Sequence, residues 1–207
     1  AAIGIITLIS VLVGMILAYL GVVQLSQFGA QIYVADLVGI GMVREMAALM
    51  TGVIMAGRTG AAYAAQLGTM QTREEIDAIR TLGLSPQQVL VVPRVLALML
   101  ALPLLVFVGD VMSLAGAMAI AGPMLDVTPN AFIARLHEAL AVRHVFVGLA
   151  KAPVFALVIA VIGARMGMTV GRDTRALGIA TTSTVVQSIV AVILLDAVFA
   201  VLMQALD

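Results

Sequence analysis

The chain has 207 residues, of which 63% are hydrophobic and 11% are charged, and its formal net charge is zero. This composition is typical of integral membrane proteins, and it excludes a nucleic-acid-binding protein that relies on an overall basic surface. The sequence contains no cysteine, which excludes disulfides and thiolate metal sites. Because a helix needs about 20 mainly apolar residues to cross the bilayer core, about five crossings fit and little is left for a soluble domain.

The first two apolar runs predict two membrane-spanning helices. The first run covers 1–23 and lacks the pattern of a signal peptide, so we expect the chain to begin inside a helix, with further sequence upstream. The mixed stretch 24–41 predicts a bend or a short helix at the membrane interface. The second spanning helix is expected from 40 to 67, with Arg44 and Glu45 near one end and Arg58 near the other.

A charged segment separates the second apolar run from the third. Residues 72–80 have the sequence TREEIDAIR, and charges at this density are too costly for the hydrocarbon layer. The segment must therefore lie outside the membrane, between two spanning helices. A compact polar helix in that position is suited to binding a soluble partner.

Local signals predict where this polar helix begins and ends. Thr72 and Glu75 have the spacing of a capping box, which marks a helix start. Gly83 offers a left-handed stop, and Pro86 prevents the helix from continuing. The segment therefore predicts a helix of about three turns, with an apolar edge on one face and charged residues on the opposite face. The predicted apolar edge consists of Ile76, Ile79 and Leu82.

Three further spans and one interfacial helix follow. The third span is expected at 89–120, with kinks at Pro93 and Pro103, and a turn is expected at 122–129. Thr128 and Pro129 predict the start of a short amphipathic helix at the interface. We expect the fourth span at 145–168, a polar loop at 171–178 and the fifth span at 181–206. On the amphipathic helix, the apolar face consists of Phe132, Leu136 and Leu140. The polar face consists of Arg135, His137 and Glu138.

The distribution of basic residues predicts the orientation in the membrane. Cytoplasmic loops of membrane proteins carry an excess of Lys and Arg. The side opposite the charged segment holds Arg135 and Arg143, with Arg44 and Lys151 near it. We therefore expect the charged segment in the cytoplasm and the C-terminus on the other side. The side of the charged segment carries Arg58, Arg73, Arg80, Arg94, Arg165, Arg172 and Arg175.

Small residues recur at steps of four along the second span. Steps of four stay on one helix face, and small side chains there allow another helix to approach closely. The stripe predicts either burial within one bundle or a homodimer face, and Glu45 borders it. Its members are Ala48, Gly52, Ala56, Gly60, Ala64 and Gly68.

Other motifs carry weaker signals. Residues 52–59 imitate a phosphate-binding loop, but Arg replaces the lysine and the motif lies inside a spanning helix, so we reject a nucleotide site there. Asp110 and Asp196 lie in apolar runs and Lys151 lies near the start of one; these are either structural groups or part of a proton or ion relay. His137 and His144 lack metal-ligand partners nearby, so we expect neither a metal nor a cofactor on this chain.

Several long motifs resemble the MlaE/YrbE family of ABC-transporter permeases. The longest is AGRTGAAYAAQLGTMQTREEIDAIRTLGLSPQQVLVVP at 56–93. VREMAALMTGVIMAGR precedes it, PRVLALMLALPLL follows it, and ALGIATTSTVVQSIVAVILLD lies near the end of the chain. The resemblance covers nearly the whole chain, which we expect to be one transmembrane permease domain over 1–207. Family members usually begin with a further amphipathic segment, and most of it is absent from this sequence.

The resemblance implies an all-α permease with about five spans, a short cytoplasmic coupling helix and a periplasmic interfacial helix. It implies a homodimer in the bacterial inner membrane that works with a cytoplasmic ATPase pair, which binds the ATP. It also implies a STAS-domain protein, a periplasmic lipid-binding MCE ring and phospholipid as the cargo, with no nucleic acid. The chain itself is expected not to be an enzyme.

The resemblance also places residues by motif. Glu45 and Lys151 match polar positions near the lipid cavity between two subunits, and the small-residue stripe is expected to serve helix packing or the dimer. The coupling helix, which docks into a groove of the ATPase, is expected to include Thr72, Glu74, Glu75, Ile76, Asp77, Ile79, Arg80 and Leu82.

Two other functions remain open from the sequence. An ion- or proton-coupled carrier would use Asp110, Asp196 and Glu45, although the chain shows no internal repeat. A membrane scaffold that transports nothing would explain the packing glycines but not the isolated polar helix. Transport direction, headgroup preference and the roles of the two aspartates are not predicted.

Overall fold

The structure is a computed structural model that describes residues 2–125, 128–171 and 173–206. The described residues form helices and connecting turns, without a β-strand among them. Because five helical segments are long and apolar enough to cross a membrane, the predicted all-α membrane fold is confirmed. These segments are Ala2–Ser26, Val34–Thr72, Gln87–Leu125, Val142–Met168 and Arg175–Ala205.

The second span starts earlier than the sequence predicts. Helix α1 (Ala2–Ser26) ends in a tight turn, in which Gly29 adopts a φ of +66° that side chains with a Cβ rarely tolerate. A short 3-10 helix, η1 (Gln31–Tyr33), leads directly into α2 (Val34–Gly41). The bend or short helix predicted within 24–41 is therefore confirmed. The second half of this stretch, however, belongs to the spanning helix, because α2 continues into it without a break.

The rest of the second span alternates between α-helical and π-helical turns. The π-helical turn η2 (Met42–Met46) contains Arg44 and Glu45, and η3 (Ala56–Gly60) contains Arg58. A π-helical turn contains about one residue more than an α-helical turn, and such turns occur often at functional sites. The α-helices α3 (Ala47–Met55) and α4 (Ala61–Thr72) complete the span.

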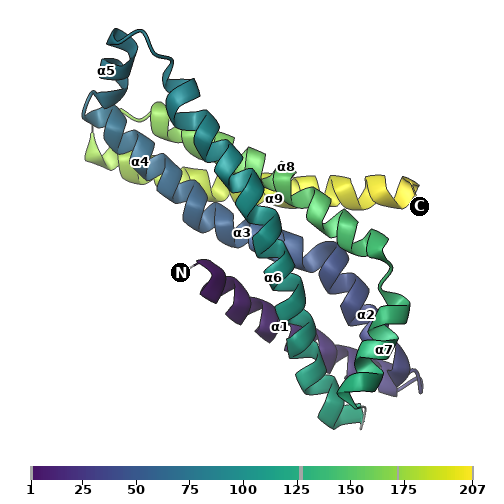
Figure 1. Cartoon of the computed structure of the whole chain (residues 1–207). Coiled ribbons are helices and arrows are strands. Elements are labelled where there is room, and N and C mark those ends of the chain that lie inside the picture. Colours follow the sequence, from purple (N-terminus) through teal and green to yellow (C-terminus); the bar gives the residue numbers. More distant parts are fainter. Residues whose placement is uncertain (1, 126–127, 172, 207) are drawn as a thin grey trace. The chain divides into compact units, whose positions relative to one another are not determined.

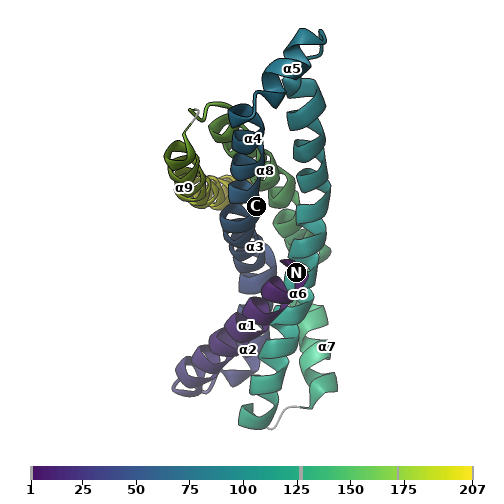
Figure 2. The same ribbon diagram turned by 90° about the vertical axis from the view of Figure 1, so that its left-hand side faces the viewer.

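The polar helix α5 (Glu75–Thr81) has two turns instead of about three. The predicted capping box is wrong, because α4 continues through Thr72 and the Thr72 hydroxyl donates back to the Thr69 carbonyl at 2.8 Å. Glu74, with a φ of 62°, precedes the helix and makes no side-chain cap. In Figures 1 and 2, α5 is a short separate helix beyond the end of α4.

The predicted helix stop at Gly83 is confirmed. Gly83 has a φ of +76°, its N–H donates to the Arg80 carbonyl at 3.0 Å, and the Leu84 N–H donates to the Ile79 carbonyl at 3.2 Å. These two hydrogen bonds form a Schellman motif, which uses carbonyl groups that the end of a helix leaves unpaired. The end of α5 is thus defined by local geometry.

The later helices are longer than predicted at several ends. The π-helical turn η4 (Gln87–Val91) leads into α6 (Val92–Leu125), so the turn predicted at 122–129 is helical up to Leu125, and its residues 126–127 lie outside the described residues. Membrane helices tolerate proline because neighbouring groups satisfy the freed backbone carbonyl. Helices α8 (Val142–Met168) and α9 (Thr174–Leu206) complete the chain, and α9 absorbs most of the predicted polar loop.

The predicted start of the interfacial helix is confirmed. Helix α7 (Pro129–Ala139) has Pro129 as its first residue and Thr128 as its N-cap. The Thr128 hydroxyl accepts a hydrogen bond from the Ala131 N–H at 3.4 Å. A hydroxyl in this place satisfies one of the N–H groups that the start of a helix leaves unpaired.

The chain divides into two compact units. Unit 1 consists of Ala1–Thr51 and Pro103–Lys151. Within it, α2 contacts both α1 and α7, as Figure 1 shows. Its buried core includes Val22, Val34, Val38, Met42 and Phe132. The single permease domain over 1–207 stays a prediction.

Unit 2 consists of Gly52–Leu102 and Ala152–Asp207. Its η3 and α4 lie against α9, which Figure 2 shows beside α4. The rings of Phe155 and Phe199 meet edge to face, with centroids 6.4 Å apart. A Cβ added at Gly163 or Gly167 of α8 would lie 2.8 Å from the carbonyl oxygen of Gly60 or Ala64, respectively, so α8 packs closely against η3 and α4.

Candidate functional site

The small-residue stripe is buried inside the chain. Ala48, Ala56 and Ala64 have no exposed surface, and the intervening glycines are buried as well. In unit 2, a Cβ added at Gly60 would lie 3.3 Å from Ile159, and a Cβ added at Gly52 would lie 3.2 Å from Phe155. Gly52 and Gly60 thus pack against α8 and α9 of the same chain. A role of the stripe in a homodimer stays a prediction.

The predicted apolar edge of α5 is divided between the interior and the surface. Ile76 is fully buried, Ile79 is half-buried, and Leu82 is 75% exposed. A three-residue step turns a helix by about 300°, so positions six residues apart differ by about 120° around the axis. Ile76 therefore faces the chain while Leu82 faces outward, and the three side chains do not form one docking edge.

The exposed part of α5 combines charge with apolar surface. Arg80 pairs with Asp77 at 2.7 Å, and Arg73 lies 3.8 Å from Glu75. Leu82 and Leu84 are exposed immediately after the helix. Charged pairs beside exposed leucines form a surface suited to a protein partner.

Glu45 and Lys151, the two residues that the resemblance places near a lipid cavity, are brought together in unit 1. The Lys151 ammonium donates a hydrogen bond to the Glu45 carboxylate. Lys151 is fully buried, whereas the Glu45 side chain is 31% exposed and its other oxygen lies 3.5 Å from the Arg44 guanidinium. A buried ammonium requires a counter-charge of this kind, because an isolated charge in an apolar interior is very costly.

A close helix crossing brings this pair together. A Cβ added at Gly148 in α8 would lie 2.1 Å from the carbonyl oxygen of Val43 in η2, so the two backbones are in direct contact. Lys151 lies about one helical turn after Gly148, and Glu45 lies two residues after Val43. The sequence gives no direct sign of this pairing, because 106 positions separate the two residues.

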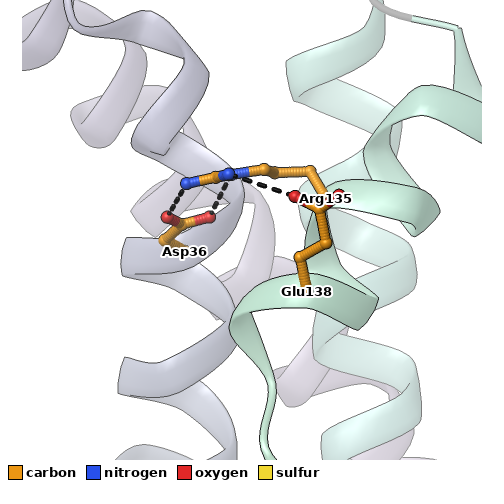
Figure 3. A network of polar contacts seen from close by, with 3 residues as sticks. All are labelled: Asp36, Arg135 and Glu138. Carbon is orange, nitrogen blue, oxygen red and sulfur yellow. Dashed lines mark hydrogen bonds and ion pairs between the residues drawn. The ribbon is translucent and has the colours of Figure 1, made fainter.

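A second polar network holds the interfacial helix, as Figure 3 shows. Arg135 of α7 donates two hydrogen bonds to the Asp36 carboxylate of α2, at 2.9 and 2.6 Å, and contacts Glu138 at 3.3 Å. The Arg135 guanidinium also lies 5.3 Å from the ring centroid of Tyr33. The hydrogen bonds to Asp36 raise the pKa of Arg135 above its ordinary value. Sequence reasoning found Arg135 but not its partner.

The two intramembrane aspartates lie in different surroundings and in different units. Asp110 is only 4% exposed, and neither of its carboxylate oxygens has a hydrogen-bond partner among the described residues. Asp196 is half-buried on α9. Within the ranges that the structure describes, no three His, Cys, Asp or Glu side chains gather in a way that could hold a metal ion.

Comparison with known proteins gives a consistent set of matches. Residues 1–202 match the family described as Permease MlaE. A probable ABC transporter permease protein of Rickettsia typhi is 34% identical over 181 residues, which cover 87% of this chain and 70% of the relative. A probable ABC transporter permease protein of Synechocystis is 33% identical, with 87% and 68% covered. The chloroplastic protein TRIGALACTOSYLDIACYLGLYCEROL 1 of Arabidopsis thaliana is 31% identical, with 94% and 56% covered.

Proposed function

The chain belongs to the MlaE permease family, and on that premise we propose that it is the membrane subunit of an ABC transporter that moves phospholipid between the inner and outer membranes of a bacterial envelope. The five spans and the permease names of the relatives support the transporter class. The glycolipid in the name of the Arabidopsis relative supports a lipid cargo.

An ABC permease works with an ATPase, and we propose that α5 is the element that binds it. The observation that carries this proposal is the exposed combination of Leu82, Leu84 and paired charges at the end of a helix outside the spans. Ile76 is buried under this exposed surface of α5. It would transmit a movement of α5 to α4, because the two helices are in contact. ATP is bound and hydrolysed by the partner in this proposal.

The lipid path is proposed to involve Glu45 and Lys151. Lys151 and Arg44 both contact the Glu45 carboxylate, and Glu45 remains partly accessible to a headgroup. Exposed apolar side chains are available for acyl chains elsewhere in the chain, and a groove of about 530 Å³ on α9 is lined by Leu194, Val198 and Leu202 among others. Cargo moves only if two conformations bind it with different affinity.

The remaining assembly is proposed from the family resemblance. It consists of two copies of this chain, an ATPase pair, a STAS-domain protein and a periplasmic MCE ring in the bacterial inner membrane. The excess of arginine near α5 supports its position on the cytoplasmic side. The exposed apolar side chains of the spans support contact with lipid or with a second copy of the chain.

The proposal is tested with Leu82→Asp in a complex of the chain and its ATPase reconstituted in vesicles. A charge at this exposed position should leave the fold intact but weaken ATPase binding, and lipid transfer should fall with it. Val142→Asp, a matched change at an 82% exposed residue at the start of α8, serves as the control. Lipid transfer that continues at full rate in Leu82→Asp would contradict the role of α5.

A charge at Ile76 would not serve the same test. Ile76→Asp would put a charge into a fully buried site and would therefore report on folding and not on docking. The alternative of an ion- or proton-coupled carrier is tested in the same vesicles. Transport that persists without ATP and stops when the proton gradient is removed would favour that carrier.

A further inference from the structure

A cavity of about 370 Å³ in unit 2 combines basic and apolar walls. It lies between the end of α8 and the segment that runs from α5 to the start of α6. Its polar wall includes Arg80 of α5, Gln87 of η4, and Arg165 and Thr169 near the end of α8. None of the residues that line it is acidic.

The donor groups in this wall match an anion. Arg80 already contacts Asp77 at 2.7 Å, which neutralises part of its charge. Arg165 is exposed and forms no ion pair with any other described residue, so its guanidinium keeps its full charge. The Gln87 amide adds two N–H donors, whereas the Thr169 hydroxyl donates to the Arg165 carbonyl at 2.9 Å. Two guanidinium groups and one amide thus face a single cavity.

The same cavity also has apolar lining residues. Val91, Val161 and Met168 line it, and all three belong to helical segments long and apolar enough to cross a membrane. A soluble anion would leave these side chains unused. A molecule with an anionic head and a hydrocarbon chain would contact both the polar and the apolar lining residues, and a basic pocket at the end of membrane spans is a known way of binding anionic lipid headgroups.

We propose that this cavity binds the phosphate-bearing headgroup of an anionic phospholipid from the surrounding leaflet. The phosphate lies between Arg80 and Arg165, and the start of an acyl chain lies along Val91 and Val161. Since Arg80 belongs to α5, occupancy of the cavity links the anionic lipid content of the membrane to the helix that we propose binds the ATPase. That link rests on the proposed function, whereas lipid binding itself does not.

Binding is measured on the purified chain in detergent, without an ATPase. Native mass spectrometry counts retained phosphatidylglycerol and phosphatidylcholine as each is titrated. One Lys or Arg near a charged lipid surface contributes about fivefold in affinity, so Arg165→Gln and Arg80→Gln should each weaken phosphatidylglycerol binding by about that factor. Arg165→Lys keeps the charge and should bind nearly as well as the unmodified chain.

Arg175→Gln is the matched control, because Arg175 is an exposed arginine at the start of α9 that does not line this cavity. It should change phosphatidylglycerol binding by less than twofold. Circular dichroism and thermal unfolding of every variant show whether a loss of binding comes from a loss of fold. Unchanged phosphatidylglycerol binding in correctly folded Arg165→Gln would overturn the proposal.

Two further outcomes would also overturn it. Inorganic phosphate that displaces phosphatidylglycerol at equal concentration would show a site for a soluble anion, because the apolar wall then contributes nothing. A folded Arg165→Gln variant that retains phosphatidylglycerol but no longer binds the ATPase would show that the cavity receives an acidic side chain of the partner protein. Selective loss of phosphatidylglycerol binding with ATPase binding intact supports the lipid site and leaves the role of α5 as a separate question.

Discussion

Replacing Gly14 with alanine should weaken the packing of α1 against α6 in unit 1. A Cβ added at Gly14 would lie 2.0 Å from the carbonyl oxygen of Ser113. The contact recurs nearby, where a Cβ at Gly116 would lie 2.3 Å from the carbonyl oxygen of Val11. Both obstacles are backbone atoms, so no side-chain rotation relieves them.

The size of the effect follows from these distances. Ordinary contacts of a Cβ begin at 3.4 Å, so the Gly14 contact must open from 2.0 Å to at least that separation. Overpacking of a tightly packed site costs about 1–3 kcal/mol, and a rigid backbone obstacle favours the upper part of this range. Alanine also gains about 1 kcal/mol over glycine as a helix former, which offsets part of the cost.

Gly4→Ala is a control in the same helix. A Cβ at Gly4 has nothing within 4 Å, so this variant has the helix-forming gain without the clash. The difference in the free energy of unfolding between the two variants should therefore be about 1–3 kcal/mol. Unfolding in detergent by sodium dodecyl sulfate, followed by circular dichroism, measures this difference. Equal stability of the two variants would refute the close crossing of α1 and α6.

Three other changes test the contacts that position the candidate site. Arg135→Lys should loosen α7, because an ammonium cannot reproduce the paired hydrogen bonds to Asp36, and hydrogen exchange of the α7 amides should become faster. Lys151→Met should lower the free energy of unfolding by about 1–3 kcal/mol, less than for a fully buried pair because Glu45 is 31% exposed. Gly83→Ala should cost about 1–2 kcal/mol at the end of α5, because its φ is +76°, and amide exchange in α5 reports it.

Each of these changes has a control and an opposing outcome. Glu138→Gln removes the outer contact of Arg135 and should have a smaller effect on α7 exchange than Arg135→Lys, and the reverse order would speak against the pairing with Asp36. A double variant of Glu45→Gln and Lys151→Met should recover stability relative to the single changes, and simple additivity would count against direct coupling. Gly57→Ala, at an open helical position, should leave α5 exchange unchanged.

The elements of this protein could be predicted from the sequence because their signals are local. Five apolar runs of sufficient length require spanning helices, since each backbone polar group must be satisfied inside a bilayer. The stop at Gly83 and the N-cap at Thr128 depend on residues only a few positions away, and both are confirmed. The capping box at Thr72 failed because a neighbouring helix continued into it.

The partners of the polar side chains could not be predicted in this way. Asp36 and Arg135 are 99 positions apart, and Glu45 and Lys151 are 106 apart, so no local pattern identifies either pair. The burial of Ile76 and the exposure of Leu82 likewise depend on which face of α5 meets its neighbour. Apolar length and caps specify where a helix forms, whereas the contacts between helix faces specify which charges meet and which surface stays open to a partner.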